Sequence, residues 1–245
     1  MPVQYKRKTS RRERGERRGK TVMNEKLKKI KIEVEKELIC SAHNMDHVMR
    51  VYNLCSVLAE SEEVDIEVIK AAALLHDIGR AKEDADHSGK TDHAILSGEM
   101  AIPILKELGF SNDKIEIIKE CITQHRYRSG NKPKTLEAKI LFDADKLDTL
   151  GAIGIARSFG WVGRNNARIY SKVEINSYIE ENLGGKINGR IQDKTKHSPQ
   201  IEFETKLKFI GERLYTEKAK NMCDERLQFY RDFLIRLENE IKGIH

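Results

Sequence analysis

The sequence predicts an all-α fold. Alternation of apolar and polar residues, which is typical of strands, is almost absent from the 245 residues. Apolar residues instead recur at helical spacing, and capping residues or glycines separate the successive runs. No apolar run approaches the length of a membrane span, and no cationic start leads into a secretory segment. With 39% hydrophobic and 34% charged residues, the chain is expected to be a soluble, cytoplasmic protein without a membrane partner.

The first 20 residues carry the basic character of the chain. They contain nine Lys or Arg against two Glu, a net charge of +7, whereas the whole chain carries +6. The remaining residues therefore sum to −1. Residues 1–22 hold almost no apolar side chains, so we expect a disordered tail. Three interpretations stay open: a solubilising tail, an upstream extension, or an arm that contacts RNA by counterion release.

Caps and glycines divide the first part of the chain into six expected helices. They lie at about 24–40, 45–58, 65–78, 95–108, 112–125 and 136–157. Either Ser111 or Asn112 is expected to cap the fifth helix. Gly79 is expected to stop the third helix, and the polar stretch 80–91 is interpreted as a surface loop.

The last third of the chain is less regular. Residues 159–198 are rich in Gly, Asn and Lys and predict a long excursion with little helical periodicity. A helical hairpin is expected over 203–241, broken around Thr216 or Asn221. The resulting division is a tail (1–22), a core (23–160) and a long loop with a helical hairpin packed on the core (161–245).

A His-Asp pair ends the third expected helix. The apolar residues before it recur at helical spacing, so His76 projects from an apolar face. Together with Asp77 it offers one borderline nitrogen ligand and one hard oxygen ligand for a metal. Because such a dipeptide also occurs by chance, the pair alone does not define a site.

Other His and Asp residues extend the pair to a constellation. His47 lies in the first turn of the second expected helix, and Asp145 lies among apolar neighbours in the sixth. Acidic groups inside an apolar helix are costly to bury unless they are paired or bind a cation. Two imidazoles and two carboxylates from three helices can hold one divalent metal and leave positions for water and substrate.

Three stretches resemble the HD-domain metal-dependent phosphohydrolases, whose signature is a His, a His-Asp pair and a distant Asp. The matching text is DHVMRV at 46–51, LLHDIG at 74–79 and DADKLD at 143–148. The run DADKLDTLGAIGIAR at 143–157 is similar to that of predicted HD hydrolases from bacteria and archaea. The resemblance covers roughly residues 25–160, and it implies an HD-domain helical bundle with a C-terminal helical extension.

The resemblance also implies a set of metal ligands. These would hold a divalent cation (Mn, Co, Ni, Fe or Mg), and they are His47, His76, Asp77 and Asp145. Asp145 is preferred to Asp143 and Asp148 because the last Asp of the family typically follows Ala. Asp148 would then orient a ligand or contact substrate. Asp77, Asp148 and Lys146 are the expected catalytic residues.

Two more histidines fall where some family members carry extra ones. Either His93 and His125 hold a second metal with Asp77 as the bridge, or they bind substrate phosphate. Arg126 and Arg157 are expected to bind substrate charge, with solvated side chains as the alternative. The remaining histidines are expected at the surface or at helix caps, and they are His43, His87, His197 and His245.

The implied activity is hydrolysis of a phosphate ester or phosphoanhydride of a small substrate by metal-activated water. A nucleotide is the preferred substrate, and nucleotidase, pyrophosphohydrolase and phosphodiesterase chemistry all stay open. One alternative is a non-catalytic, metal-binding regulatory or scaffold protein. Another is an RNA-associated factor that uses the basic tail, which would be the only nucleic-acid contact. The sequence leaves the oligomeric state open and is compatible with a homo-oligomer.

Overall fold

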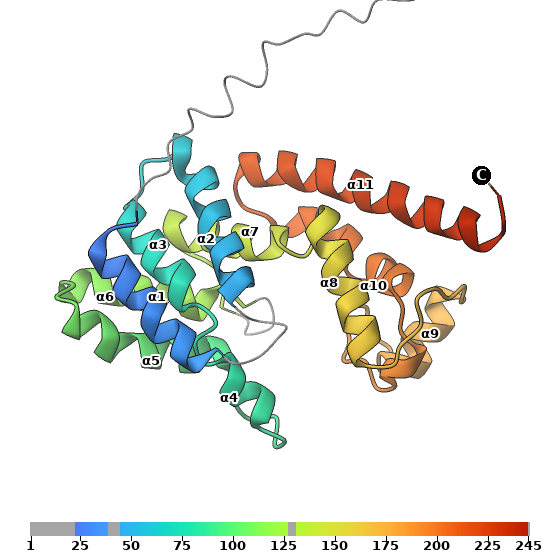
Figure 1. Cartoon of the computed structure of the whole chain (residues 1–245), viewed down its shortest axis with the longest axis horizontal. Helices are drawn as coiled ribbons and strands as arrows, with labels where there is room; N and C mark the ends of the chain where they lie inside the picture. The colour runs from blue at the N-terminus through green and yellow to red at the C-terminus, as the bar shows by residue number, and fades with distance from the viewer. Residues whose placement is uncertain (1–22, 39–44, 127–130, 245) are drawn as a thin grey trace, which may run out of the picture.

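The computed structural model describes residues 23–38, 45–126 and 131–244, and all regular structure within these ranges is helical. The prediction of an all-α fold is confirmed. The chain forms a helical bundle followed by a second helical group beside it (Figure 1). The bundle contains α1 (Glu25–Glu37), α2 (Met45–Leu58), α3 (Ile66–Leu75), α4 (Arg80–Ala85), α5 (His93–Glu107), α6 (Asn112–Gln124) and α7 (Leu136–Leu147).

The second group follows a short break after α7. It contains α8 (Gly151–Arg164), α9 (Ile175–Asn182), α10 (Pro199–Thr205), α11 (Glu217–Ile241) and the 3-10 turns η2 (Lys194–Lys196), η3 (Leu207–Phe209) and η4 (Gly211–Arg213). A further 3-10 turn, η1 (Ala59–Ser61), follows α2. Helix α11 packs against α8 and also contacts α7, so it joins the second group to the bundle (Figure 1).

Helix α3 is the centre of the bundle. Every residue from Val68 to Leu75 is buried, and the helix contacts α1, α2, α5, α6 and α7. Because α3 is surrounded in this way, residues that directly follow its last turn lie in the interior. Those residues are His76 and Asp77, which are 0% and 3% exposed.

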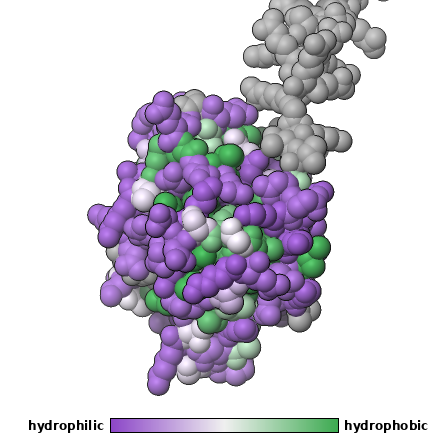
Figure 2. Space-filling model, turned by 90° about the vertical axis from the view of Figure 1, so that its left-hand side faces the viewer, coloured by the Kyte–Doolittle hydropathy of each residue, from purple (hydrophilic) through white to green (hydrophobic). Residues whose placement is uncertain are grey.

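The face of the molecule drawn in Figure 2 is mainly hydrophilic. Small separate hydrophobic areas lie between the hydrophilic residues on this face. Single exposed apolar side chains of this kind are normal on soluble proteins. None of the helices in the described part of the chain is both long and apolar enough to cross a bilayer.

Several expected helix ends are confirmed. Ser111 caps α6, since its hydroxyl accepts a hydrogen bond from the Lys114 backbone N–H at 3.4 Å. Gly109 follows α5 with a φ of +67°, a backbone conformation that favours glycine at a helix end. Asn44 is a residue type that favours the N-cap position before α2, and it lies outside the described residues.

The expected end of α3 is partly wrong. The helix stops at Leu75, so the His-Asp pair lies in a turn beyond it and not in its last turn. Gly79 has a φ of −85°, so it is not needed for a left-handed backbone conformation. Its role is to let helix α5 approach the backbone closely. A Cβ there would lie 3.0 Å from the Ser97 backbone nitrogen and 3.2 Å from the His93 carbonyl oxygen. The expected loop 80–91 also begins with helix α4.

The single helix expected over 136–157 is wrong. The chain breaks at residues 148–150, and α8 starts at Gly151 with a φ of +65°. The Arg226 guanidinium of α11 donates to the Leu147 carbonyl at 2.6 Å and so satisfies the end of α7. Apolar periodicity continued through the break because both helices bury one face against neighbouring helices.

Gly154 is required by the tight start of α8. A Cβ at this position would collide with the Thr149 carbonyl group, whereas a Cβ at Gly160 meets no atom within 4 Å. We therefore expect Gly154→Ala to lower the free energy of unfolding by about 2–3 kcal/mol. The matched control, Gly160→Ala, should be neutral or stabilising by up to about 1 kcal/mol. Urea denaturation measures both, and equal effects would contradict this explanation.

The expected excursion over 159–198 is also wrong in part. It contains the end of α8, helix α9 and turn η2, and its Tyr178 and Leu183 form a small apolar core with Ile201 of α10. His197, which was expected at the surface, is 3% exposed. Its ring contacts the Tyr178 hydroxyl at 2.9 Å and the Glu202 carboxylate at 3.1 Å. Short helices between glycines give too few turns for a clear periodicity.

The C-terminal helical pair differs from the expected hairpin. Its first arm is short, since α10 ends at Thr205 and two 3-10 turns follow. The second arm is α11, which has 25 residues and is the longest described helix. Thr216 caps it, so the break ends at the first of the two expected positions.

Candidate metal centre

Four buried histidines approach one another from four helices. His47 lies in the first turn of α2, His76 follows α3, His93 begins α5 and His125 follows α6. They are between 0% and 4% exposed. Ring centroids of neighbouring pairs are 5.1–5.3 Å apart, so the rings form one cluster in the interior.

The Nδ1 atoms of two of these rings contact backbone carbonyl groups. His76 Nδ1 lies 2.8 Å from the Ala73 oxygen, and His125 Nδ1 lies 2.6 Å from the Ile122 oxygen. A carbonyl only accepts, so Nδ1 must donate, and Nε2 of each neutral ring then carries the lone pair. The backbone at the ends of α3 and α6 therefore selects the tautomer that can bind a metal through Nε2.

In the other two rings, the Nδ1 atom contacts a carboxylate and not a backbone carbonyl. Asp148 Oδ2 lies 2.8 Å from His47 Nδ1, and Glu83 Oε2 lies 2.8 Å from His93 Nδ1. A carboxylate behind a ligating imidazole fixes the ring orientation and raises its basicity. Because each Nδ1 atom has its own partner, all four Nε2 atoms face the same central space.

Asp77 lies at the centre of this space. Its Oδ2 is 3.7 Å from His47 Nε2 and 3.8 Å from His76 Nε2. Its Oδ1 is 3.3 Å from His93 Nε2 and 3.7 Å from His125 Nε2. Each carboxylate oxygen therefore faces its own pair of imidazole nitrogens.

These residues form two groups that could each hold a metal ion. The ligand atoms within each group all lie within 4.8 Å of one another, and the groups are His47, His76, Asp77 and Asp77, His93, His125. Neutral imidazole nitrogen with carboxylate oxygen suits divalent transition metals. The residues fit the cation that the sequence implies, and they provide for one or two ions.

Asp145 extends the first group. Its Oδ1 lies 3.4 Å from His47 Nε2, and its Oδ2 accepts from Lys146 Nζ at 2.6 Å. The competing Asp143 is turned away from the centre and is fully buried. Its carboxylate accepts hydrogen bonds from the Tyr215 and Thr216 N–H groups at 3.0 and 2.8 Å, which holds the start of α11.

Asp148 lies behind His47 and not at the centre. Besides His47, it accepts from Arg50 Nε at 2.7 Å and from Arg157 Nη1 at 2.5 Å. Its side chain is 2% exposed. Of the two roles expected for Asp148, orientation of a ligand fits this position better than substrate contact does.

The central charges shift the pKa values of the cluster. Burial lowers the pKa of His47, but hydrogen bonds to Asp145 and Asp148 outweigh this and raise it to about 9. Burial lowers the pKa of His76 and of His93 to about 4. Burial raises the pKa of Asp77, but the imidazoles around it hold that pKa well below its usual value. At neutral pH, His47 of the metal-free cluster is therefore expected to carry a proton.

A metal ion can bind His47 only after that proton leaves. At pH 7.5, well below the pKa of about 9, we expect metal binding to release about one proton from His47. Affinity should then rise with pH by up to about tenfold per unit until the pKa is reached. Calorimetric Mn titration in buffers of different ionisation enthalpy measures the release. His47→Gln should release about one proton fewer, and an unchanged value would contradict the assignment.

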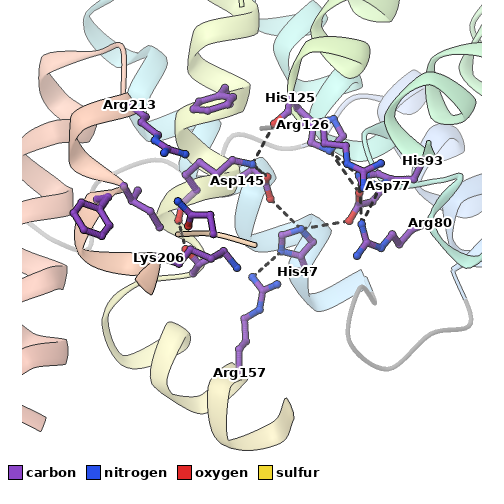
Figure 3. A pocket seen from close by; sticks show the side chains of 16 residues that line it. His47, Asp77, Arg80, His93, His125, Arg126, Asp145, Arg157, Lys206 and Arg213 are labelled. Carbon is purple, nitrogen blue, oxygen red and sulfur yellow. Dashed lines mark hydrogen bonds and ion pairs between the residues drawn. The ribbon is translucent and has the colours of Figure 1, made fainter. Parts of the chain in front are cut away.

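A pocket of about 340 Å³ opens at the cluster. Its walls carry six cationic side chains, namely Arg80, Arg126, Lys146, Arg157, Lys206 and Arg213. Lys206 and Arg213 face the centre from the side opposite to Arg80 and His93 (Figure 3). The pocket therefore combines a candidate metal centre with a strongly cationic wall, which suits a phosphorylated ligand.

The sequence interpretation did not include several of these residues. Arg80, Asn188, Lys206 and Arg213 line the pocket, and Glu83 holds both His93 and Arg126. Arg80 directly follows the LLHDIG stretch, so its position was a usable signal. The other residues lie far from the motifs or in the stretch expected to be a loop. His87 is exposed, and His43 and His245 lie outside the described residues.

Residues 44–150 match the HD domain family. The chain belongs to the HD-domain superfamily. This match contains all the ligand candidates, and it lies within the 25–160 span that the sequence resemblance covers. An uncharacterised protein of Clostridium beijerinckii is 33% identical over 118 residues, which are 47% of this chain and 71% of that protein.

Two other proteins are similar to most of the chain. The uncharacterised protein YpgQ of Bacillus subtilis is 27% identical over 208 residues, which are 83% of this chain and 87% of YpgQ. A predicted HD superfamily hydrolase from an uncultured Thermotogales bacterium is 28% identical with a TM-score of 0.58, over 88% of this chain and 91% of that one. The likeness therefore extends past residue 150 into the second helical group.

Proposed function

We propose that this HD-domain protein is a metal-dependent phosphohydrolase that acts on nucleotides and uses two divalent cations. The observation that carries the proposal is the position of Asp77, whose two oxygens face separate pairs of imidazole Nε2 atoms. In this proposal His47, His76 and Asp145 complete one ion's ligands, and His93 and His125 complete the other's. When bound, such cations supply a hydroxide at neutral pH and polarise the phosphoryl oxygens.

The chain's own residues then bind and orient the substrate. Arg126 is held by Glu83 at 2.7 Å and by Asp92 at 3.0 Å, so its guanidinium is fixed at the wall of the pocket. Arg157 and Lys206 offer charge from the opposite group of helices. Lys146 binds Asp145, which fixes a ligand and adds a positive charge where phosphate charge develops.

Two observations support a nucleotide as substrate. The pocket volume of about 340 Å³ lies at the lower end of the range for small-molecule sites, about 300–1,000 Å³, which suits a mononucleotide. In addition, YpgQ of Bacillus subtilis has been crystallised in complex with ADP, and it shares this fold with a TM-score of 0.66 at 24% identity.

The open pocket also favours an enzyme over a closed, structural metal site. A site that only stabilises a fold is closed by protein ligands, whereas a catalytic site keeps positions for water and substrate. Here the cluster borders open space on the side of the cationic wall (Figure 3). This arrangement supports turnover over the regulatory or scaffold alternative.

The test is metal-dependent hydrolysis with product identification. Purified protein is assayed with Mn, Co, Ni, Fe and Mg against nucleoside mono-, di- and triphosphates, and phosphate is measured separately from pyrophosphate. His76→Ala should lose activity by at least about 10²-fold, because it removes a ligand. The matched control is His87→Ala, an exposed histidine outside the pocket. Activity that survives His76→Ala would overturn the proposed site.

A further inference from the structure

Helix α8 presents a stripe of residues of which only Arg157 also lines the pocket at the metal centre. Its buried side carries Gly151, Gly154, Ile155 and Val162. The other side has members spaced three and four residues apart, which places them on one helical face. They are Ile153, Ala156, Arg157, Gly160, Trp161 and Arg164. This face combines cations, apolar side chains and an aromatic ring.

The stripe forms one wall of a groove of about 570 Å³, and Gly154, Ser158 and Val162 of the same helix also line this groove. Arg50 of α2 and Ile191 also line the groove, and His197 contacts the Trp161 ring at a centroid distance of 5.3 Å and an interplanar angle of 79°. The small residues Ala156 and Gly160 leave room beside Trp161. A Cβ at Gly160 would meet no atom within 4 Å, so the groove is open at this point.

The groove continues the pocket at the metal centre. Four residues line both spaces, and they are Arg80, Thr149, Arg157 and Lys206. The pocket alone, at about 340 Å³, has the size that one mononucleotide needs. The groove adds the larger volume of about 570 Å³, so the combined site is larger than a mononucleotide requires.

The groove is also cationic along its length. Five of its lining residues are Arg or Lys, against Asp46 and Glu202. Arg157 lies at the end shared with the metal centre, and Arg164 lies seven residues further along α8. Seven residues span about 10 Å of helix axis. The two guanidinium groups are therefore far enough apart along the groove to contact different phosphates of one strand.

We infer that this groove binds a short single-stranded oligonucleotide whose terminal phosphate reaches the metal centre. The inference rests on the proposed function for the reaction at that end. Arg157 and Arg164 contact the backbone phosphates, and Trp161 stacks on a base, the combination by which proteins bind single strands without reading their sequence. Ile153, which is 39% exposed, gives the bases an apolar surface.

The experiment compares two glycines of α8. Gly160 lines the groove and Gly163 does not, and neither would bring a new Cβ within 4 Å of another atom. Gly160→Leu fills the groove, and Gly163→Leu is the matched control. The full chain with Mn is tested on a 5′-phosphorylated tetranucleotide, as RNA and as DNA, and on a mononucleotide. Fluorescence anisotropy measures binding, and kcat/KM is measured for release of the 5′-phosphate, in which water breaks the terminal P–O ester bond and leaves a 5′-hydroxyl.

We expect Gly160→Leu to lose about tenfold more kcat/KM on the tetranucleotide than on the mononucleotide, since stacking and phosphate contacts are lost together. Trp161→Ala should show the same preference at about fivefold, and Gly163→Leu should change neither substrate by more than about twofold. The RNA and DNA arms decide which sugar the groove prefers.

Three results would overturn the inference. Equal losses on both substrates would make the groove the base site of a mononucleotide. If the mononucleotide is cleaved but the tetranucleotide is neither bound nor cleaved, the proposed function stands and the groove does not bind a strand. Binding that persists in Gly160→Leu would belong to the basic residues 1–20. If neither substrate is cleaved, the proposed function fails, and the anisotropy of Gly160→Leu still decides whether the groove holds a strand.

Discussion

Asp77→Asn is expected to lower kcat/KM by at least about 10³-fold and to reduce the bound metal from about two ions per chain to below one. The amide keeps the shape of the side chain but loses the charge and one of the two oxygens that face the imidazole pairs. Loss of one transition-state donor typically costs about 10²–10³-fold, and this change weakens two ions at once. Metal analysis after gel filtration and steady-state kinetics measure the effects.

A comparison with His93→Ala separates one-metal from two-metal arrangements. His93 faces only Oδ1 of Asp77, so its removal should release one ion and leave the other. His87→Ala, on the exposed histidine, should keep the full metal content. Retention of two ions by Asp77→Asn would show that this carboxylate does not bridge them.

Asp148→Ala is expected to lower both stability and metal affinity. The carboxylate accepts from Arg50, Arg157 and His47, and its loss leaves two guanidinium groups close together. Removing one partner of a buried ion pair typically costs about 3–5 kcal/mol. Arg50 and Arg157 are 30% and 28% exposed, so water offsets part of this cost and we expect about 2–3 kcal/mol.

The metal effect of Asp148→Ala follows from the ring that it holds. Without the carboxylate, His47 loses the partner that fixes its orientation. Loss of such a partner typically lowers metal affinity by about 10–100-fold. Urea denaturation and metal titration measure the two effects. Asp224→Asn, an exposed carboxylate on α11, is the control. A stable variant with unchanged metal affinity would contradict the positioning role.

Several residues of the candidate metal centre were predictable from sequence because they are polar side chains within apolar helical segments. His76 and Asp77 stood out after an apolar helix, and Asp145 stood out inside another. The structure brings these residues together with His47, His93 and His125. The roles of these residues are still proposals, but their common location follows from where each helix begins or ends.

The residues that were missed lack such a local signal. Lys206 and Arg213 are ordinary surface cations by sequence, and only the path of the chain after α10 turns them toward the pocket. His197 has no nearby apolar periodicity, so its burial against Tyr178 depends on contacts made by α9. The break after Leu147 was hidden because apolar spacing continues through it.

The cationic wall comes from two parts of the chain with different origins in the sequence. Every ligand candidate lies before residue 150, within the span that matches the HD domain family, whereas Asn188, Lys206 and Arg213 come from later segments. We therefore expect substitutions in those later segments to change substrate preference more than metal affinity. We expect related proteins that share the candidate metal centre to differ in substrate preference mainly in the region that corresponds to residues 188–213.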